Sequence, residues 1–328
     1  MTTTRTTRTT GIEWTDRTWN PVTGCTKVSP GCDHCYAAGI AHRFAGTKAF
    51  PHGFALTLHP DRLTAPLRWR APARVFVNSM SDMFHRDIPD AYIAQVWAVM
   101  ATTPQHTYQV LTKRHARMRA LLGSPSFWHL VAEQGRRHVA GSQQGWLAVG
   151  KMLGGAPLPN VWVGVSVENQ QWANTRIPAL LDTPAAVRFL SCEPLLGPVD
   201  LSAWLACPHL SSTGDEGPAA ELGRDVRRWR CDWCGTVHGE GTDRRGLGWV
   251  IVGGESGPGA RQMDPAWAHT LVGQCQASDV PVFVKQMGSA HGPHKGNDPT
   301  TWPGGLRVRE FPGTPLVVPS PDTGVSAH

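Results

Sequence analysis

Long apolar runs are missing from this sequence. No stretch approaches the roughly 18 apolar residues that a membrane-spanning helix requires. Met1–Thr10 consists almost entirely of threonine and arginine, so it lacks the apolar centre of a secretory signal. We therefore expect a cytoplasmic protein without membrane contact, and we expect residues 1–10 to form a disordered leader.

Net charge is also small. The 31 Lys and Arg residues and 25 Asp and Glu residues give a formal charge of +6 over 328 residues. Such a balance permits contact with nucleic acid or nucleotides, but a solvated basic surface would have the same composition. The length fits one large α/β domain with insertions or two small domains, and the hydrophobic fraction of 41% is ordinary for a soluble protein.

The chain has eight cysteines, and the absence of an export signal argues against a disulfide framework. Six of the eight fall into two clusters. In a reducing cytosol, clustered thiols more often bind metal or take part in catalysis than form bridges. Both clusters are therefore candidate functional sites.

Short apolar runs rich in β-branched residues recur along the chain and are followed by polar residues, as expected of buried parallel strands. These runs are Val75–Val77, Tyr108–Leu111, Val161–Val165, Val187–Leu190, Trp249–Val252 and Val282–Val284. Helical patterns lie between them. One follows Pro89-Asp90, and another begins with Asp264 as N-cap and Pro265 as first helical residue. This alternation predicts an α/β fold, a full or partial (β/α) barrel with a small metal-binding insertion.

Functional groups of such barrels gather at the carboxyl ends of the strands. The polar residues at these ends are Asn78, Asp82, Lys113, Ser166, Glu168, Glu193, Glu255 and Lys285. We take Asp82, Lys113 and Glu193 as candidate catalytic residues. For any single position, a helix cap or a turn residue is an equally good interpretation.

The first cysteine cluster has the spacing C-x6-C-x2-C. Cys25, Cys32 and Cys35 lie on a segment rich in glycine and proline, which suits a chain that wraps closely around a metal group. Three thiolates can hold three irons of a [4Fe–4S] cluster and leave the fourth iron open to a small molecule. Structural zinc with a fourth ligand such as His34 or His42, and unligated thiols, remain alternatives.

The second cluster lies in a polar insertion at 205–246. Cys231 and Cys234 form a C-x2-C knuckle, with Cys207 and His209 upstream. These four residues are candidate zinc ligands, and zinc would explain how a segment with so little apolar content folds. A second iron–sulfur cluster and a flexible loop with free thiols are the alternatives. Another insertion, at 124–159, is rich in glycine and glutamine and has little clear periodicity. We interpret residues 313–328 as a flexible tail.

Several motifs resemble a phage- and bacterium-associated three-Cys-motif family of unknown function that is regarded as radical-SAM-like. The resemblance covers about residues 11 to 290. It rests on Gly11–Asp16, Trp19–Pro21, Gly24–Cys25, Val28–Cys32, Cys35–Ala37, Val77–Asp82, Leu111–Arg114, Asn160–Trp162, Gly164–Glu168, Leu190–Leu196, Val252–Gly257 and Lys285–Gln286.

The resemblance implies a radical SAM type of barrel with a [4Fe–4S] cluster on Cys25, Cys32 and Cys35. It also implies S-adenosylmethionine (SAM), which reduction through the cluster cleaves to a 5′-deoxyadenosyl radical. Electrons would come from a reductant such as flavodoxin or ferredoxin. The substrate would be a nucleic acid or nucleotide, and a partner protein could be encoded nearby. The common radical SAM spacing is C-x3-C-x2-C, so the first gap here is longer.

The same resemblance suggests where SAM would bind. Gly253-Gly254-Glu255 is similar to the Gly-Gly-Glu segment that contacts the SAM amino group, although it follows a late strand rather than the second. Ser166 and Glu168 lie where contacts to ribose hydroxyls are often found.

Two other functions remain open. The first is a non-enzymatic zinc-binding module that contacts nucleic acid or protein. The second is a metal-dependent hydrolase or nuclease that uses the carboxylates at the strand ends.

Overall fold

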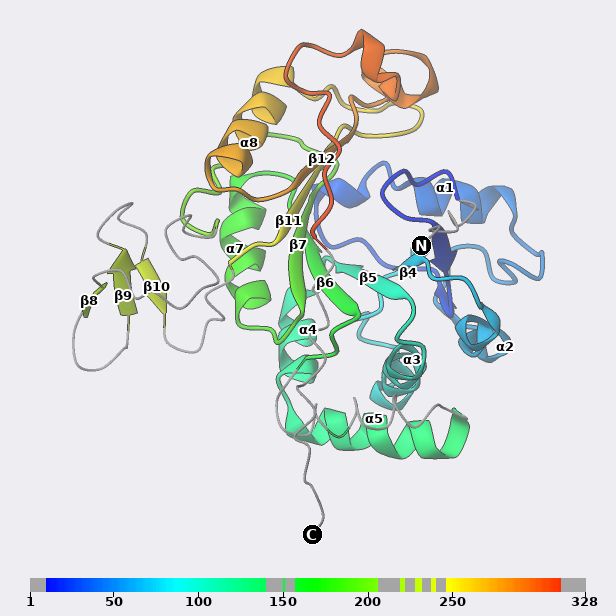
Figure 1. Ribbon diagram of the computed structural model, residues 1–328. Coiled ribbons are helices and arrows are strands. Elements are labelled where there is room, and N and C mark those ends of the chain that lie inside the picture. The colour runs from blue at the N-terminus through cyan, green and yellow to red at the C-terminus, as the bar shows by residue number, and fades with distance from the viewer. Residues whose placement is uncertain are drawn as a thin grey trace.

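The computed structural model (Figure 1) describes residues 10–139, 157–205 and 246–313. It also describes residue 150 and the backbone of three short strands between 219 and 239. None of the helices in this part of the chain combines the length and apolarity that a membrane span needs.

A seven-stranded parallel sheet forms the centre of the molecule. Its strands are β1 (Arg17–Trp19), β4 (Arg74–Val77), β5 (Thr107–Thr112), β6 (Val161–Ser166), β7 (Val187–Cys192), β11 (Trp249–Gly253) and β12 (Val282–Gln286). The strands lie side by side in the order in which they occur along the chain, and every neighbouring pair is parallel. Because the order never reverses, the sheet winds in one direction and forms a half-barrel, which is a partial β/α barrel.

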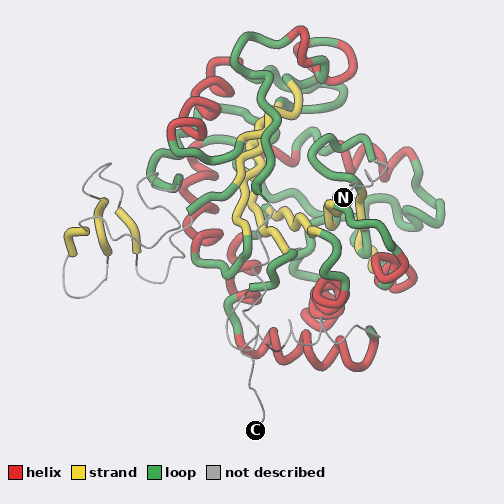
Figure 2. The backbone as a smooth tube through the Cα atoms, viewed as in Figure 1, coloured by secondary structure: helices red, strands yellow, loops and turns green. Residues whose placement is uncertain are grey.

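Helices cover one face of this sheet (Figure 2). They are α3 (Asp90–Thr102), α4 (His115–Leu122), α5 (Pro125–His138), α7 (Gln170–Leu181) and α8 (Pro265–Ala277). Alternate strand residues such as Val75, Val163 and Val250 pack with these helices in the main hydrophobic core. The strands are therefore buried on both faces, which explains their continuous apolar runs.

The other face of the sheet carries a second, aromatic cluster. Phe76, Phe189 and Trp249 belong to it, together with Trp14 from the segment before β1. Phe311, near the end of the described chain, stacks at 5.5 Å from Trp249. Segments near both ends of the described chain thus pack on this face of the sheet and form a floor of rings, the aromatic floor.

The remaining short elements lie between β1 and β4 or follow β12. They are β2 (Val22–Thr23), η1 (Pro30–Cys32), α1 (Tyr36–Arg43), β3 (Thr57–Leu58), α2 (Pro60–Leu63), η2 (Ala65–Arg68), η3 (Ser289–His291), η4 (Pro293–Gly296) and η5 (Pro299–Thr301). β2 pairs with β3 as an antiparallel ribbon, so the cysteine-bearing segment leaves and rejoins the barrel beside β1.

All six apolar runs form strands of the sheet, and the two predicted helices are confirmed as α3 and α8. Asp264 caps α8 by accepting a hydrogen bond from the Ala266 backbone N–H at 2.9 Å. The segment 124–159 is not irregular throughout, because its first half forms α5. Phe127, Trp128 and Val131 lie buried on one side of that helix. Interspersed His, Gln and Arg residues hide this periodicity in the sequence.

The insertion at 205–246 contributes β8 (Ala219–Glu221), β9 (Arg228–Cys231) and β10 (Val237–Gly239), which form an antiparallel sheet of their own. Of the predicted zinc ligands, Cys207, His209 and Cys234 lie outside the described residues, and only the backbone of Cys231 is described. The zinc site therefore stays a prediction, as do the leader at residues 1–10 and the tail at 313–328.

Candidate functional site

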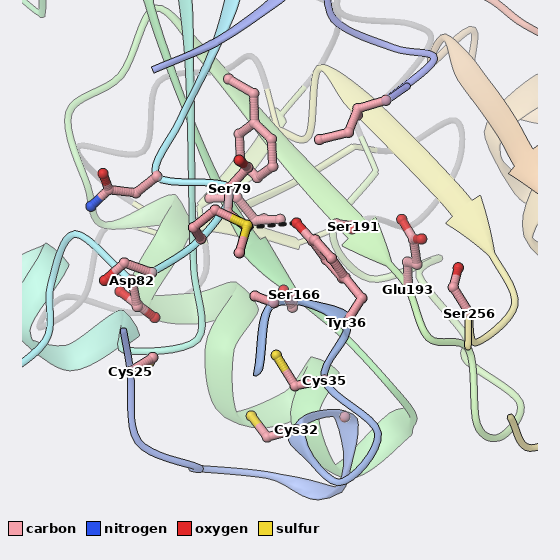
Figure 3. Close-up of a pocket in the computed structure, with 18 of the residues that line it drawn as sticks. Cys25, Cys32, Cys35, Tyr36, Ser79, Asp82, Ser166, Ser191, Glu193 and Ser256 are labelled. Carbon is pink, nitrogen blue, oxygen red and sulfur yellow. Dashed lines mark hydrogen bonds between the residues drawn. The ribbon is translucent and has the colours of Figure 1, made fainter. Parts of the chain in front are cut away.

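A cavity of about 490 Å³ opens at the carboxyl ends of the sheet strands. Trp14, Phe76 and Leu111 form its apolar base. Small polar side chains line its wall at successive strand ends, and these are Asn78, Ser79, Thr112, Ser166, Ser191 and Ser256 (Figure 3). The volume falls within the range of small-molecule sites, and the mixture of an apolar base with a few polar groups is typical of them.

The cysteine loop, residues 24–35, borders this cavity. Cys25 follows β2, Cys32 ends η1 and Cys35 is the N-cap of α1. All three are half-buried free thiols, and all three line the cavity (Figure 3). Three cysteines that lie up to ten positions apart in the sequence therefore line one cavity.

Cys25 has the most distinctive environment of the three. Its Sγ donates to the Thr26 carbonyl at 3.4 Å, and Arg114 Nη2 lies 3.9 Å from the sulfur. Burial and then the Asp82 carboxylate raise the pKa of the Cys25 thiol to about 11, against the opposing effect of Arg114. At neutral pH the side chain is a neutral thiol, so a bound metal would have to displace its proton.

The donor set suits a soft metal, since thiolates are ligands for zinc and for iron–sulfur clusters. Within the described residues, no three His, Cys, Asp or Glu side chains meet closely enough to hold one metal ion. Ligands of a single zinc must converge on one point, whereas thiolates of a cluster bind different irons and stand farther apart. Three thiols that line one cavity offer donors that either an iron–sulfur cluster or zinc would take.

Glu168 holds the cysteine loop from beneath. It accepts a hydrogen bond from Ser29 Oγ at 2.7 Å and forms ion pairs with Lys113 at 3.2 Å and Arg176 at 2.8 Å. Gly31 lies directly on this carboxylate, because a Cβ there would approach Glu168 Oε1 to 2.5 Å. Burial alone would raise the pKa of Glu168, but Lys113, Arg176 and Ser29 outweigh it and lower the pKa.

This position differs from the one expected for a ribose contact. Glu168 is fully buried, is not among the cavity-lining residues, and has both carboxylate oxygens engaged. In this arrangement it is a structural anchor of the cysteine loop. Ser166, predicted together with it, does line the cavity, and its carbonyl accepts a hydrogen bond from Arg176.

A second anchor joins the cysteine loop to the segment after β11. Arg261 pairs with Glu255 at 2.5 Å, donates to the Pro30 carbonyl at 2.8 Å, and lies 3.7 Å from Asp33. Burial would raise the pKa of Glu255, but the hydrogen bonds from Arg261 overcome this effect and lower the pKa. Glu255 lines the cavity as expected, yet both of its oxygens already accept from Arg261.

The two glycines before Glu255 have different surroundings. Gly254 lines the cavity, and a Cβ on it would lie 2.1 Å from the Met287 carbonyl oxygen. Gly254 is therefore required for the close approach of the chain after β11 to the end of β12, whether or not a ligand binds. Gly253 is not among the residues that line the cavity.

We expect Arg261→Ala to loosen the cysteine loop without unfolding the barrel. The variant loses charge-assisted hydrogen bonds at a half-exposed site, so local opening of residues 30–35 should become about 5- to 10-fold more frequent. Hydrogen exchange measured by mass spectrometry would show this at Gly31–Cys35. Arg307→Ala, which removes an exposed arginine bonded to the Thr300 carbonyl, is the matched control. Unchanged exchange at Gly31–Cys35 in Arg261→Ala would contradict the anchoring role.

The three predicted catalytic residues all line the cavity, and each has a partner there. Asp82 accepts from Thr112 Oγ1 at 2.7 Å and from the Lys113 backbone N–H at 3.0 Å. It thus ties together the chain after β4 and the end of β5. Glu193 pairs with Lys285 at 2.5 Å. Lys113 pairs with Glu168.

Sequence reasoning missed several residues of this site. Arg176 is fully buried beside Glu168, and its Nε and Nη2 have no hydrogen-bond partner among the described residues. The hydroxyl of Tyr36 donates to the Ser79 carbonyl at 2.6 Å, which joins α1 to the end of β4. Arg114 donates to the Thr26 carbonyl and hydroxyl. The only signal for Tyr36 was its place directly after Cys35, and nothing in the pattern marked Arg176.

The fold and cavity define a partial β/α-barrel protein with a three-cysteine loop at the mouth of its barrel. The chain belongs to the family described as "Protein of unknown function (DUF5131)", whose model matches residues 9–304. No curated protein and no solved structure matches the chain significantly.

Proposed function

We propose that this protein binds a [4Fe–4S] cluster through Cys25, Cys32 and Cys35 and acts as a radical-SAM-like enzyme on a nucleic-acid-related substrate. One observation carries the proposal: three thiols of one loop line a single cavity at the mouth of a partial barrel. Three protein ligands leave one iron of a cubane open to the amino and carboxylate groups of SAM. When bound, the cluster would supply the electron that cleaves SAM, with a flavodoxin or ferredoxin as its source.

Three basic side chains lie around the cysteine loop. Arg114 lies beside the Cys25 sulfur, and Arg176 interacts electrostatically with Cys32. Lys113 lines the same cavity. Thiolates that hold a cluster carry negative charge, which these cations would offset in part. Lys113 and Arg176 also pair with Glu168. At Cys25, burial and Asp82 raise the thiol pKa by more than Arg114 lowers it.

The rest of the cavity would bind the organic ligands. Glu193 with Lys285, and the hydroxyls of Ser166 and Ser191, offer both charges and neutral hydrogen-bonding groups to an amino acid moiety or a ribose. The aromatic floor beneath them is buried and excludes water from below, which suits a reactive intermediate.

Anaerobic purification with metal analysis and electron paramagnetic resonance tests the proposal. We expect brown protein with about four irons per chain and, after reduction, a cluster signal that changes when SAM is added. SAM cleavage should follow reduction. Colourless protein that contains zinc and does not respond to SAM would contradict the proposal and favour the non-enzymatic zinc-binding module.

A further inference from the structure

Large apolar side chains that remain exposed occur at one place in the described part of the chain. They are Tyr36, Ile40 and Phe44, with 44%, 39% and 48% of their surface accessible. Tyr36 and Ile40 belong to α1, and Phe44 is its C-cap. The spacing of four residues puts all three on one side of the helix. We call this stripe, with the exposed residues 45–49 that follow it, the α1 face.

The α1 face is continuous with the cavity. Tyr36 and Ile40 are themselves cavity-lining residues, and the Tyr36 hydroxyl is fixed to the Ser79 carbonyl (Figure 3). Phe44 lies two helical turns from Tyr36, about 12 Å along the helix axis. A ligand on this stripe would therefore reach from the outer surface to the rim of the cavity.

The chain segment that carries the stripe is basic. Residues 21–60 contain Lys27, Arg43 and Lys48, four histidines and a single acid, Asp33. Asp33 pairs with Lys27 and Arg261. Arg43 and Lys48 are exposed, and neither forms an ion pair with another described residue. Lys295, from η4, also lines the cavity.

We infer that the α1 face binds single-stranded nucleic acid and leads one nucleotide into the cavity. Aromatic rings beside basic side chains are how proteins hold single strands, because rings stack on bases while cations neutralise phosphates. An apolar stripe alone would suit a protein partner, but basic flanks with one already-paired acid favour a polyanion. A strand offers unstacked bases, which a duplex does not. The inference deepens the proposed function by naming a polynucleotide as the substrate class.

Fluorescence anisotropy with the metal-free protein tests this inference independently of the cluster. The probes are 5′-labelled mixed-sequence DNA and RNA oligonucleotides of about 16 nucleotides. We expect Phe44→Ala to weaken binding on the order of 10-fold, since each stacked base contributes substantially. Phe44→Trp should retain binding, whereas Phe44→Leu, which keeps apolar area but has no ring, should bind as weakly as Phe44→Ala.

The basic residues are tested through salt dependence. Arg43→Ala and Lys48→Ala should each reduce the slope of log K against log salt concentration by about 0.7. Arg136→Ala, which removes an exposed arginine of α5, is the matched control and should leave affinity and slope unchanged. Thermal melting of each variant confirms that it is folded, as expected for exposed positions.

Three results would overturn the inference: no binding by the wild type, equal binding by Phe44→Ala and the wild type, or equal affinity for duplex and single strand. Sedimentation showing a wild-type dimer and a Phe44→Ala monomer would make the α1 face an interface between copies of the chain instead. Iron content of the same variants separates the two proposals. Phe44→Ala should load iron normally, and metal-free protein should bind oligonucleotides even if no cluster forms.

Discussion

Replacement of Glu168 by alanine is expected to lower the free energy of unfolding by about 3–5 kcal/mol. Glu168 and Arg176 are both fully buried and lie 2.8 Å apart. Without the carboxylate, the guanidinium keeps the Ser166 carbonyl as a hydrogen-bond acceptor and the Trp172 ring at 4.1 Å as a cation–π contact, and neither carries a compensating charge. Its Nε and Nη2 already have no hydrogen-bond partner among the described residues. An uncompensated charge in the interior explains the size of the effect.

Urea denaturation followed by circular dichroism at pH 7 measures this loss. The double variant Glu168→Met/Arg176→Met is the control, because it removes both charges and replaces them with apolar groups. Its stability should lie well above that of Glu168→Ala. A Glu168→Ala protein that unfolds at the wild-type urea concentration would show that the pair contributes nothing to the fold.

The same carboxyl predicts a pH dependence. Lys113, Arg176 and Ser29 overcome the effect of burial and hold the pKa of Glu168 below its ordinary value of 4.5. The stabilisation is therefore complete above about pH 4.5 and is lost as the pH falls through the lower folded-state pKa. In Glu168→Gln, the decline of unfolding free energy as the pH falls below about 4.5 should be shallower than in the wild type.

Replacement of any one of Cys25, Cys32 and Cys35 by alanine is expected to remove the iron and abolish SAM cleavage. Each replacement would leave the cubane with only two protein thiolates. Loss of a metal ligand lowers the metal content of a protein far more than a surface substitution does. All three residues are half-buried and lie outside the main hydrophobic core. Thermal stability of the metal-free variants should therefore stay close to that of the metal-free wild type.

Cys275→Ala is the matched control for these variants. Cys275 is fully buried on α8 in the main core and does not line the cavity. Its replacement should lower stability by about 1–2 kcal/mol and leave the iron content unchanged. Full iron content in a Cys32→Ala protein would place the metal elsewhere and remove the basis of the proposed chemistry.

Local pattern was sufficient for most of the framework. Runs of β-branched residues such as Val161–Val165 favour a buried strand, and Asp264 before Pro265 favours a helix start. β1 escaped notice because it has three residues and only Trp19 is buried. The half-barrel follows from the order of the strands in the sheet. Strand order depends on contacts between distant parts of the chain, so local sequence patterns do not predict it.

The site divides in the same way. By itself, the sequence determined that three thiols would lie on one glycine- and proline-containing loop, because their spacing is local. Only the tertiary structure decided that Glu168 would lie under that loop, 139 positions from Ser29, and that Arg261 would reach Pro30 from 231 positions away. Ion pairing depends on which strand ends become neighbours in the fold. The sequence therefore suggested that Glu168 contacts a ribose, whereas the structure places it as an anchor of the cysteine loop. The sequence did not predict the exposure of Tyr36, Ile40 and Phe44 either. An apolar stripe on a helix normally indicates a buried face, and only the tertiary structure shows that these three side chains are exposed.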